Sequence, residues 1–269
     1  MIHSPVIRRL ALLVVISAPL LAAPAAAQQK VDLELILMVD GSGSVDDNEF
    51  VLQRLGYVRA LRNPRVISAI GSGPLGRIAI AYVEWSGADL KVPIVPWTLL
   101  SDKASIAAVA DRLEREPRVL YGGGTAIGDA ILYGVRSLAT NAFQGKRRVI
   151  DLSGDGPDRD GLPAVFGRDQ AVAQGITVNG LPILGEFDNL DIFFLDNVIG
   201  GPGAFSILAK TFKDFNSAIL TKLIREIAGR AGSGPVNRPR AAQGPPHPPP
   251  EPPGTGLDGV PPWSNLGPP

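Results

Sequence analysis

The sequence has no cysteine and only two histidines, His3 and His247, which lie near the ends of its 269 residues. The central chain therefore carries no thiol and no imidazole, which excludes disulfide scaffolds, cysteine zinc sites and catalysis by Cys–His or Ser–His pairs. The formal net charge is zero, because 26 basic side chains balance 26 acidic ones. Binding of nucleic acid driven by bulk positive charge is excluded in the same way, so we expect no nucleic-acid partner.

Residues 1–27 have the layout of a secretory signal peptide. The paired arginines Arg8 and Arg9 are followed by an apolar run and then by small residues that end at Ala27. The apolar run is short and is interrupted by a serine and a proline, which favours cleavage after Ala27 over a transmembrane anchor. We therefore expect an exported protein, periplasmic or secreted, with no integral membrane span in the mature chain.

The last segment, residues 234–269, differs in composition from the rest, since it holds 13 of the 25 prolines. Such a segment cannot bury enough apolar surface to build a packed core, so we expect a disordered tail. Two interpretations stay open for it. It is either a polyproline II ligand or spacer, or a solvated tail with no specific contact.

Between these segments, residues 28–233 are long enough for one domain. Short continuous apolar runs predict buried strands at five places: 33–39, 77–83, 148–152, 176–181 and 204–208. Apolar residues at helical spacing predict helices at four: 51–61, 106–113, 127–138 and 212–227.

The alternation of strands and helices predicts an α/β fold of three layers, a doubly wound and mainly parallel central sheet flanked by helices. Asp46 with Glu49 is a plausible capping pair for the first helix, and Gly229 is a plausible stop for the last. In such sheets ligands bind beyond the carboxyl ends of the strands. The loops that follow the strands are therefore the places to look for function.

Oxygen-bearing side chains occur in three of these loops. Asp40, Ser42 and Ser44 alternate with glycines directly after the first predicted strand, Thr125 follows three glycines before a predicted helix, and Asp155 follows the strand at 148–152. Oxygen ligands in octahedral array are what Mg²⁺ prefers. All three loops are expected at one edge of the sheet, so their oxygens are candidates to hold one hard divalent cation.

In this order and context the five residues resemble the metal-ion-dependent adhesion site of von Willebrand factor type A domains. The resemblance covers residues 31–229 by element order. Three segments further resemble an uncharacterised bacterial, secreted branch of that superfamily with a domain of unknown function: 82–86, 150–157 and 196–205.

The resemblance implies that Ser42, Ser44 and Thr125 coordinate the ion directly, while Asp40 and Asp155 act largely through bound water. Mg²⁺ is the expected ion, with Mn²⁺ or Ca²⁺ as alternatives. Uncharged hydroxyls would leave the cation electrophilic, so that an Asp or Glu side chain of a partner protein completes its shell. The function implied is adhesion or protein binding without catalysis.

Two other functions remain open. In the first, the chain is a Mg²⁺-dependent phosphatase or other hydrolase with Asp40 as nucleophile, although Ser42 stands where such phosphatases have a second carboxylate and the nearest basic candidate is Arg159. In the second, the metal site is empty and the proline-rich tail carries the function as a scaffold.

Several further features are expected to be structural. Glu84, Trp85 and Trp97 are interpreted as packing and sheet-edge residues. The glycine-rich segment 71–76 is interpreted as a turn, because it lacks the Lys-Ser/Thr of a phosphate loop. Residues 158–160 are expected to form a solvated surface beside the third metal loop.

Overall fold

The computed structural model describes residues 27–185 and 187–229. The expected signal peptide, apart from Ala27, and the proline-rich segment 234–269 lie outside these residues, so both remain predictions. In the described chain no helix combines the length and the apolar character needed to span a membrane.

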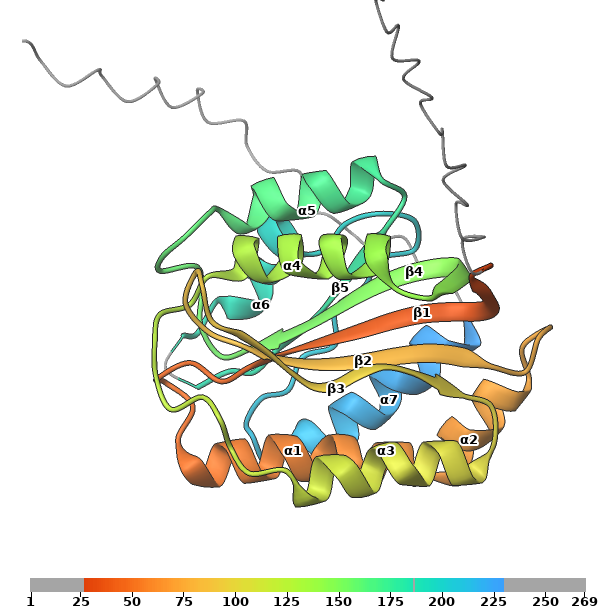
Figure 1. The fold of residues 1–269 in the computed structure, drawn as a ribbon. Helices are drawn as coiled ribbons and strands as arrows, with labels where there is room; N and C mark the ends of the chain where they lie inside the picture. Colours follow the sequence, from red (N-terminus) through yellow and green to blue (C-terminus); the bar gives the residue numbers. More distant parts are fainter. Residues whose placement is uncertain (1–26, 186, 230–269) are drawn as a thin grey trace, which may run out of the picture. The chain divides into compact units, whose positions relative to one another are not determined.

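A five-stranded sheet with the order β3-β2-β1-β4-β5 forms the centre of the described part of the chain (Figure 1). Its strands have these bounds: β1 Gln29–Asp40, β2 Ile78–Trp85, β3 Lys91–Leu100, β4 Phe143–Gly154 and β5 Thr177–Pro182. The strand β1 pairs in parallel with both β2 and β4, and β4 pairs in parallel with β5. Only β3, at one edge, is antiparallel to its neighbour. The predicted mainly parallel sheet is confirmed.

Helices cover both faces of the sheet (Figure 1). On one face lie α1 Asp47–Leu61, α2 Pro64–Gly71, α3 Lys103–Arg115 and α7 Phe215–Ala228. On the other lie α4 Ile127–Thr140, α5 Ala164–Ala173, α6 Leu190–Phe193 and the π-helical segment η1 Phe194–Val198. The three-layer α/β fold expected from the sequence is therefore present.

The central strand β1 divides the core in two because its side chains alternate between the faces. Leu35 and Leu37 pack into the cluster shared with α1, α3 and α7, whereas Ile36 and Met38 pack into the cluster shared with α4 and α5. All four are completely buried. A strand covered on both faces reads as a continuous apolar run, which is why the sequence identified it.

The expected helix ends are confirmed at both places. Asp46 accepts a hydrogen bond from the Glu49 amide at 2.8 Å, and the Glu49 carboxylate accepts one from the Asp46 amide at 3.0 Å, which completes a capping box on α1. Gly229 ends α7 with φ 62°, a left-handed conformation that favours glycine.

The strand predicted at 204–208 is wrong. This segment makes one isolated bridge to β5, at Gly180 with Ser206, and a second bridge joins Ile183 and Ala209 just beyond the two segments. The amide of Phe205 donates instead to the side-chain Oδ1 of Asn179 at 2.9 Å, so a side chain of β5 takes the donor that a continuous ladder would use.

Five elements were not predicted from the sequence: β3, α2, α5, α6 and η1. The glycine-rich segment 71–76 is a turn after α2, as expected, and Gly76 has φ 63° there.

Candidate metal centre

The five predicted site residues lie where the parallel strands end. Asp40 is the last residue of β1, and Asp155 directly follows β4, the neighbour of β1. Ser42 and Ser44 lie in the loop between β1 and α1, and Thr125 lies two residues before α4. Because β1 and β4 run in parallel side by side, the loops that follow them meet at one edge of the sheet.

Hydrogen bonds connect four of these residues in a chain. The Ser42 amide donates to Oδ1 of Asp40 at 2.8 Å. The hydroxyls of Ser42 and Ser44 lie 3.1 Å apart, and the Ser44 hydroxyl donates to Oδ1 of Asp155 at 2.7 Å. The structure therefore brings oxygens of two separate loops into direct contact.

Thr125 approaches from the second loop. It is 4% exposed, and its backbone carbonyl accepts hydrogen bonds from the amides of Arg159 at 2.9 Å and Asp160 at 3.5 Å. Its Oγ1 is 3.9 Å from the position that a Cβ would take on Gly156. Thr125 is thus fixed against the loop that carries Asp155.

The Asp40 carboxylate is placed where a cation would stabilise it. It is completely buried, and its Oδ2 has no hydrogen-bond partner among the described residues. Burial raises the pKa of Asp40 to about 7, and repulsion from Asp155 adds to this rise. A nearby positive charge would offset both effects, so the unpartnered oxygen fits a bound divalent ion.

The donor set is poor in charge. It has two carboxylates and three hydroxyls, and no group of three or more His, Cys, Asp or Glu side chains is placed to hold a metal elsewhere in the described residues. Space at the carboxylate is preserved by Gly154, where a Cβ would lie 2.9 Å from Oδ2 of Asp40. A set of this kind fits Mg²⁺ or another hard divalent cation.

Two residues outside the predicted set position these loops. The Ser86 hydroxyl, just after β2, donates to the carbonyl of Gly122 at 2.7 Å and lies 3.1 Å from that of Gly124. The Arg118 guanidinium donates to the carbonyl of Val45 at 2.7 Å, and to that of Leu120 at 2.6 Å. Arg118 therefore joins the first loop to the second, and nothing in the sequence pattern marks it for that role.

The expectation of a solvated surface at 158–160 is wrong for Asp158. Its carboxylate accepts hydrogen bonds from the amide of Ile127, at 2.9 Å, and from the amide of Ala164. These are the first residues of α4 and α5, so one half-buried carboxylate caps both helices beside the metal loops. Its neighbours Arg159 and Asp160 are exposed, as expected.

The residues interpreted as packing and sheet-edge residues lie in the core and on the edge strand. Glu84 and Trp85 are completely buried at the end of β2, and Glu84 forms an ion pair with Arg54. Trp97 lies on the edge strand β3 and donates its indole N–H to Ser137 at 2.9 Å.

Solved structures with a similar fold include a matrix protein and a pilus adhesin. Proximal thread matrix protein 1 from the mussel byssus, with a zinc-occupied MIDAS motif, matches with a TM-score of 0.58 and 16% identity over 75% of this chain and 49% of that chain. The pilus adhesin SpaC from Lactobacillus rhamnosus GG matches with a TM-score of 0.55 and 15% identity, over 75% of this chain and 31% of that chain.

A von Willebrand factor type A protein from Catenulispora acidiphila matches with a TM-score of 0.52 and 18% identity, over 73% of this chain and 43% of that chain. This chain thus spans less than half the length of each of these three proteins. No curated protein matches it.

The family model described as "Protein of unknown function (DUF1194)" matches residues 30–231, which include every described strand and helix except the first residue of β1. The chain therefore belongs to the DUF1194 family, and its fold is that of the von Willebrand factor type A domains.

Proposed function

We propose that this domain is an exported, non-enzymatic binding module that captures a protein partner through a divalent cation held by Asp40, Ser42, Ser44, Thr125 and Asp155. The observation that carries the proposal is the hydroxyl-rich chain of contacts from Asp40 to Asp155, next to a buried carboxylate oxygen without a partner. Because three of the five proposed ligands are uncharged hydroxyls, a bound ion would keep much of its positive charge. An Asp or Glu side chain of the partner is the ligand that such an ion would attract.

The burial of Asp40 supports binding over the hydrolase alternative. An attacking carboxylate must reach the substrate, yet Asp40 is completely buried and its Oδ1 already accepts the Ser42 amide. Asp40 is better placed to orient the serine loop. Ser44 and Thr125 then present their hydroxyls toward the same edge of the sheet.

Export is proposed from the layout of residues 1–27. Proteins of similar fold come from the mussel byssus and from a bacterial pilus, which fits an extracytoplasmic role. The proposed ion is Mg²⁺, with Mn²⁺, Ca²⁺ or Zn²⁺ as alternatives that a titration would rank.

The first experiment measures the unfolding temperature of the mature protein in millimolar Mg²⁺ and in EDTA. An ion at one hundred times its dissociation constant stabilises by about 2.7 kcal/mol, which for a domain of this size is roughly 5–10 °C. We expect that shift in the wild type and not in Asp40→Ala or Ser42→Ala. Asp89→Ala removes an exposed carboxylate from the loop after β2 and is the matched control, which should keep the shift.

A second experiment tests the partner chemistry. Peptides selected on the Mg²⁺-loaded protein should contain an essential Asp or Glu, and changing it to Asn or Gln should abolish binding. Binding that survives both EDTA and Asp40→Ala would contradict the proposal.

A further inference from the structure

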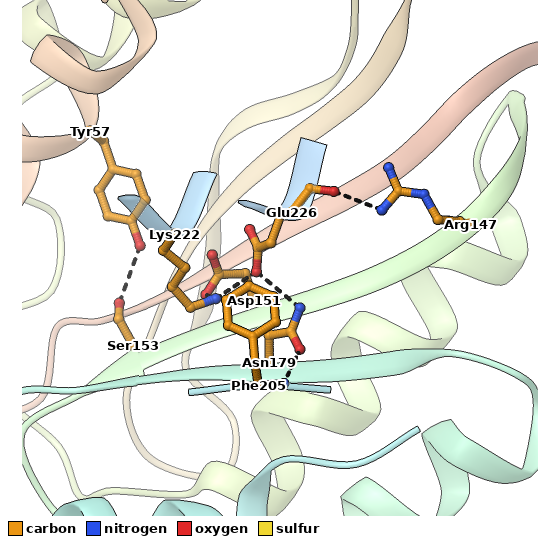
Figure 2. Close-up of polar contacts among 8 residues, drawn as sticks. All are labelled: Tyr57, Arg147, Asp151, Ser153, Asn179, Phe205, Lys222 and Glu226. Atoms are coloured by element: carbon orange, nitrogen blue, oxygen red, sulfur yellow. Dashed lines mark hydrogen bonds and ion pairs between the residues drawn. The ribbon is translucent and has the colours of Figure 1, made fainter. Parts of the chain in front are cut away.

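A second polar cluster lies inside the described domain, between the sheet and α7 (Figure 2). Asp151 on β4 faces Lys222 and Glu226, which lie one turn apart on α7. Lys222 and Asp151 have no exposed surface, and Glu226 is 2% exposed. None of the three belongs to the candidate metal centre.

The contacts in this cluster bring an amine against two carboxyl groups. Nζ of Lys222 lies 2.6 Å from Oδ1 of Asp151 and 2.5 Å from Oε1 of Glu226. The same Oε1 accepts a hydrogen bond from the side-chain amide of Asn179 at 3.2 Å. The approach of Nζ to Asp151 lacks hydrogen-bond geometry, since neither Asp151 oxygen has a hydrogen-bond partner among the described residues. The ion pair thus places the nitrogen directly against the acceptor carboxyl group.

The electrostatics of the cluster are unfavourable if all three groups are ionised. Two carboxylates and one ammonium would then be buried together, with Oε2 of Glu226 unpartnered as well. Burial raises the pKa of Glu226 to about 8, and repulsion from Asp151 contributes to the rise. Near neutral pH Glu226 is therefore largely a protonated acid that can donate to Asp151.

From this arrangement we propose that Lys222 and Asp151 condense to form an intramolecular isopeptide bond, with Glu226 as the catalytic acid–base group. Glu226 touches the reacting nitrogen directly and lies against the acceptor carboxyl. Product formation would remove the positive charge of Lys222 and the negative charge of Asp151. With Glu226 protonated, the buried cluster would then hold no charged group, in place of an ion pair whose net charge is zero.

The reaction balances without any oxidant or co-reactant. A proton passes from the Lys222 ammonium, by way of Glu226, to the Asp151 carboxylate, which leaves a free amine and a neutral carboxylic acid. The nitrogen lone pair attacks Cγ of Asp151 and forms the Nζ–Cγ bond. The nitrogen then loses a second proton, and one oxygen of Asp151 leaves with both protons as water. Glu226 ends in its starting protonation state.

Because the reacting groups of Lys222, Asp151 and Glu226 are held in contact, formation of the bond is favoured over a lasting ion pair. Groups held in contact react with effective concentrations of roughly 10⁵–10⁸ M. The Phe205 ring lies 5.2 Å from Nζ and covers the cluster with apolar surface. A cavity of about 250 Å³ that is lined by Asn179, Phe205 and Glu226 offers the released water a path outward.

The test is peptide mapping of the purified full chain after digestion with trypsin. A bond at Lys222 blocks cleavage there and joins two segments, so we expect one branched peptide made of residues 149–159 and 214–225. Its mass should equal the sum of the two segments minus one water. The linear peptide that ends at Lys222 should be lost to the same extent.

Variants identify the groups involved. Lys222→Arg keeps the charge but removes the nucleophilic amine, so the branched peptide should disappear. Glu226→Gln, checked for folding by circular dichroism, should leave Lys222 unlinked. Lys213→Arg changes an exposed lysine just before α7 and should keep the branched peptide unchanged.

Recovery of both linear peptides in full from the wild type, with no branched peptide, would overturn the proposal whatever the variants do. A branched peptide as abundant in folded Glu226→Gln as in the wild type would overturn the role given to Glu226. The experiment needs no metal and no partner, so its outcome is independent of the proposed function.

Discussion

Two adjacent residues beside the candidate metal centre, Gly122 and Gly123, differ in how strongly the structure requires glycine. Gly123 has φ 99°, and a Cβ there would lie 2.5 Å from the Ser86 hydroxyl that holds the loop. At Gly122 a Cβ would meet nothing within 4 Å, and φ is not positive. The loop that delivers Thr125 therefore depends on one of the two glycines far more than on the other.

We predict that Gly123→Ala destabilises the protein by about 1–3 kcal/mol, because it combines a strained backbone with a steric clash. Gly122→Ala is the matched control and should change the stability little. Chemical denaturation measures both, and the Mg²⁺-dependent shift should weaken in Gly123→Ala. Equal losses in the two variants would contradict this account of the loop.

The buried pair of Arg54 and Glu84 lies under the same end of the sheet. The Arg54 guanidinium also donates to the carbonyls of Leu113 at 3.0 Å and Glu116 at 2.8 Å. Burial raises the pKa of Glu84, and the Arg54 charge opposes that rise.

We predict that Arg54→Met costs about 3–5 kcal/mol, because it leaves a buried carboxylate without its partner. Arg62→Met is the control, since Arg62 pairs with Asp111 and Glu114 on the surface and should contribute little measurable stability. Urea denaturation compares the two. A small effect at Arg54 would mean that Glu84 is already neutral in the folded protein.

At this scale the sequence predicted the residues that carry oxygens but not those that position them. Asp40, Ser42 and Ser44 follow a recognisable strand, and a turn over residues 42–45 brings the hydroxyls of Ser42 and Ser44 within 3.1 Å of each other. Ser86 and Arg118 act across more than 30 residues of sequence through backbone carbonyls, and such contacts leave no local pattern. Positioning residues of this kind become visible only when the loops are seen together.

The helix α7 is the element whose stability should depend on pH. The pKa of Glu226 is raised from 4.5 to about 8, mainly by burial. Between these values the folded state keeps a proton that the unfolded state has released. The free energy of unfolding must therefore fall as the pH rises through this window.

We predict that the wild type is less stable at pH 8 than at pH 5, and that Glu226→Gln loses less stability over the same range. Urea denaturation in EDTA at both pH values measures the difference. Comparison with the variant is essential, because Asp40 has a raised pKa of the same sign. A fall of equal size in both proteins would assign the pH dependence to groups other than Glu226.

The elements that the sequence analysis missed or predicted wrongly have different causes. The edge strand β3 contains Pro93 and Pro96, which an edge strand tolerates but which interrupt the pattern used to recognise strands. The helix α2 has only eight residues, too few for a repeated apolar stripe. Residues 204–208 have the apolar run that is typical of a strand, but the backbone amide of Phe205 donates its hydrogen bond to the side chain of Asn179 and not to a neighbouring strand. Only the last of these outcomes depends on a tertiary contact, whereas the other two follow from the local sequence.

The described domain has all three layers of the fold, the sheet and a layer of helices on each of its faces (Figure 1). One apolar cluster fills the face toward α1, α3 and α7, and a second fills the face toward α4 and α5. All five candidate metal ligands lie between residues 40 and 155, and the family model extends only to residue 231. The core and the candidate site therefore depend on residues that precede the proline-rich segment.

This division predicts the effect of removing residues 234–269. The truncated protein should unfold within about 2 °C of the full chain, a change of at most about 1 kcal/mol for a domain of this size. Its Mg²⁺-dependent shift should be retained, because no candidate ligand is removed. Differential scanning calorimetry of both proteins, each in Mg²⁺ and in EDTA, measures the two quantities together.

Loss of the Mg²⁺ shift on truncation would show that the proline-rich segment takes part in the metal site. Retention of the shift with loss of binding to the selected acidic peptides would instead place partner recognition in that segment.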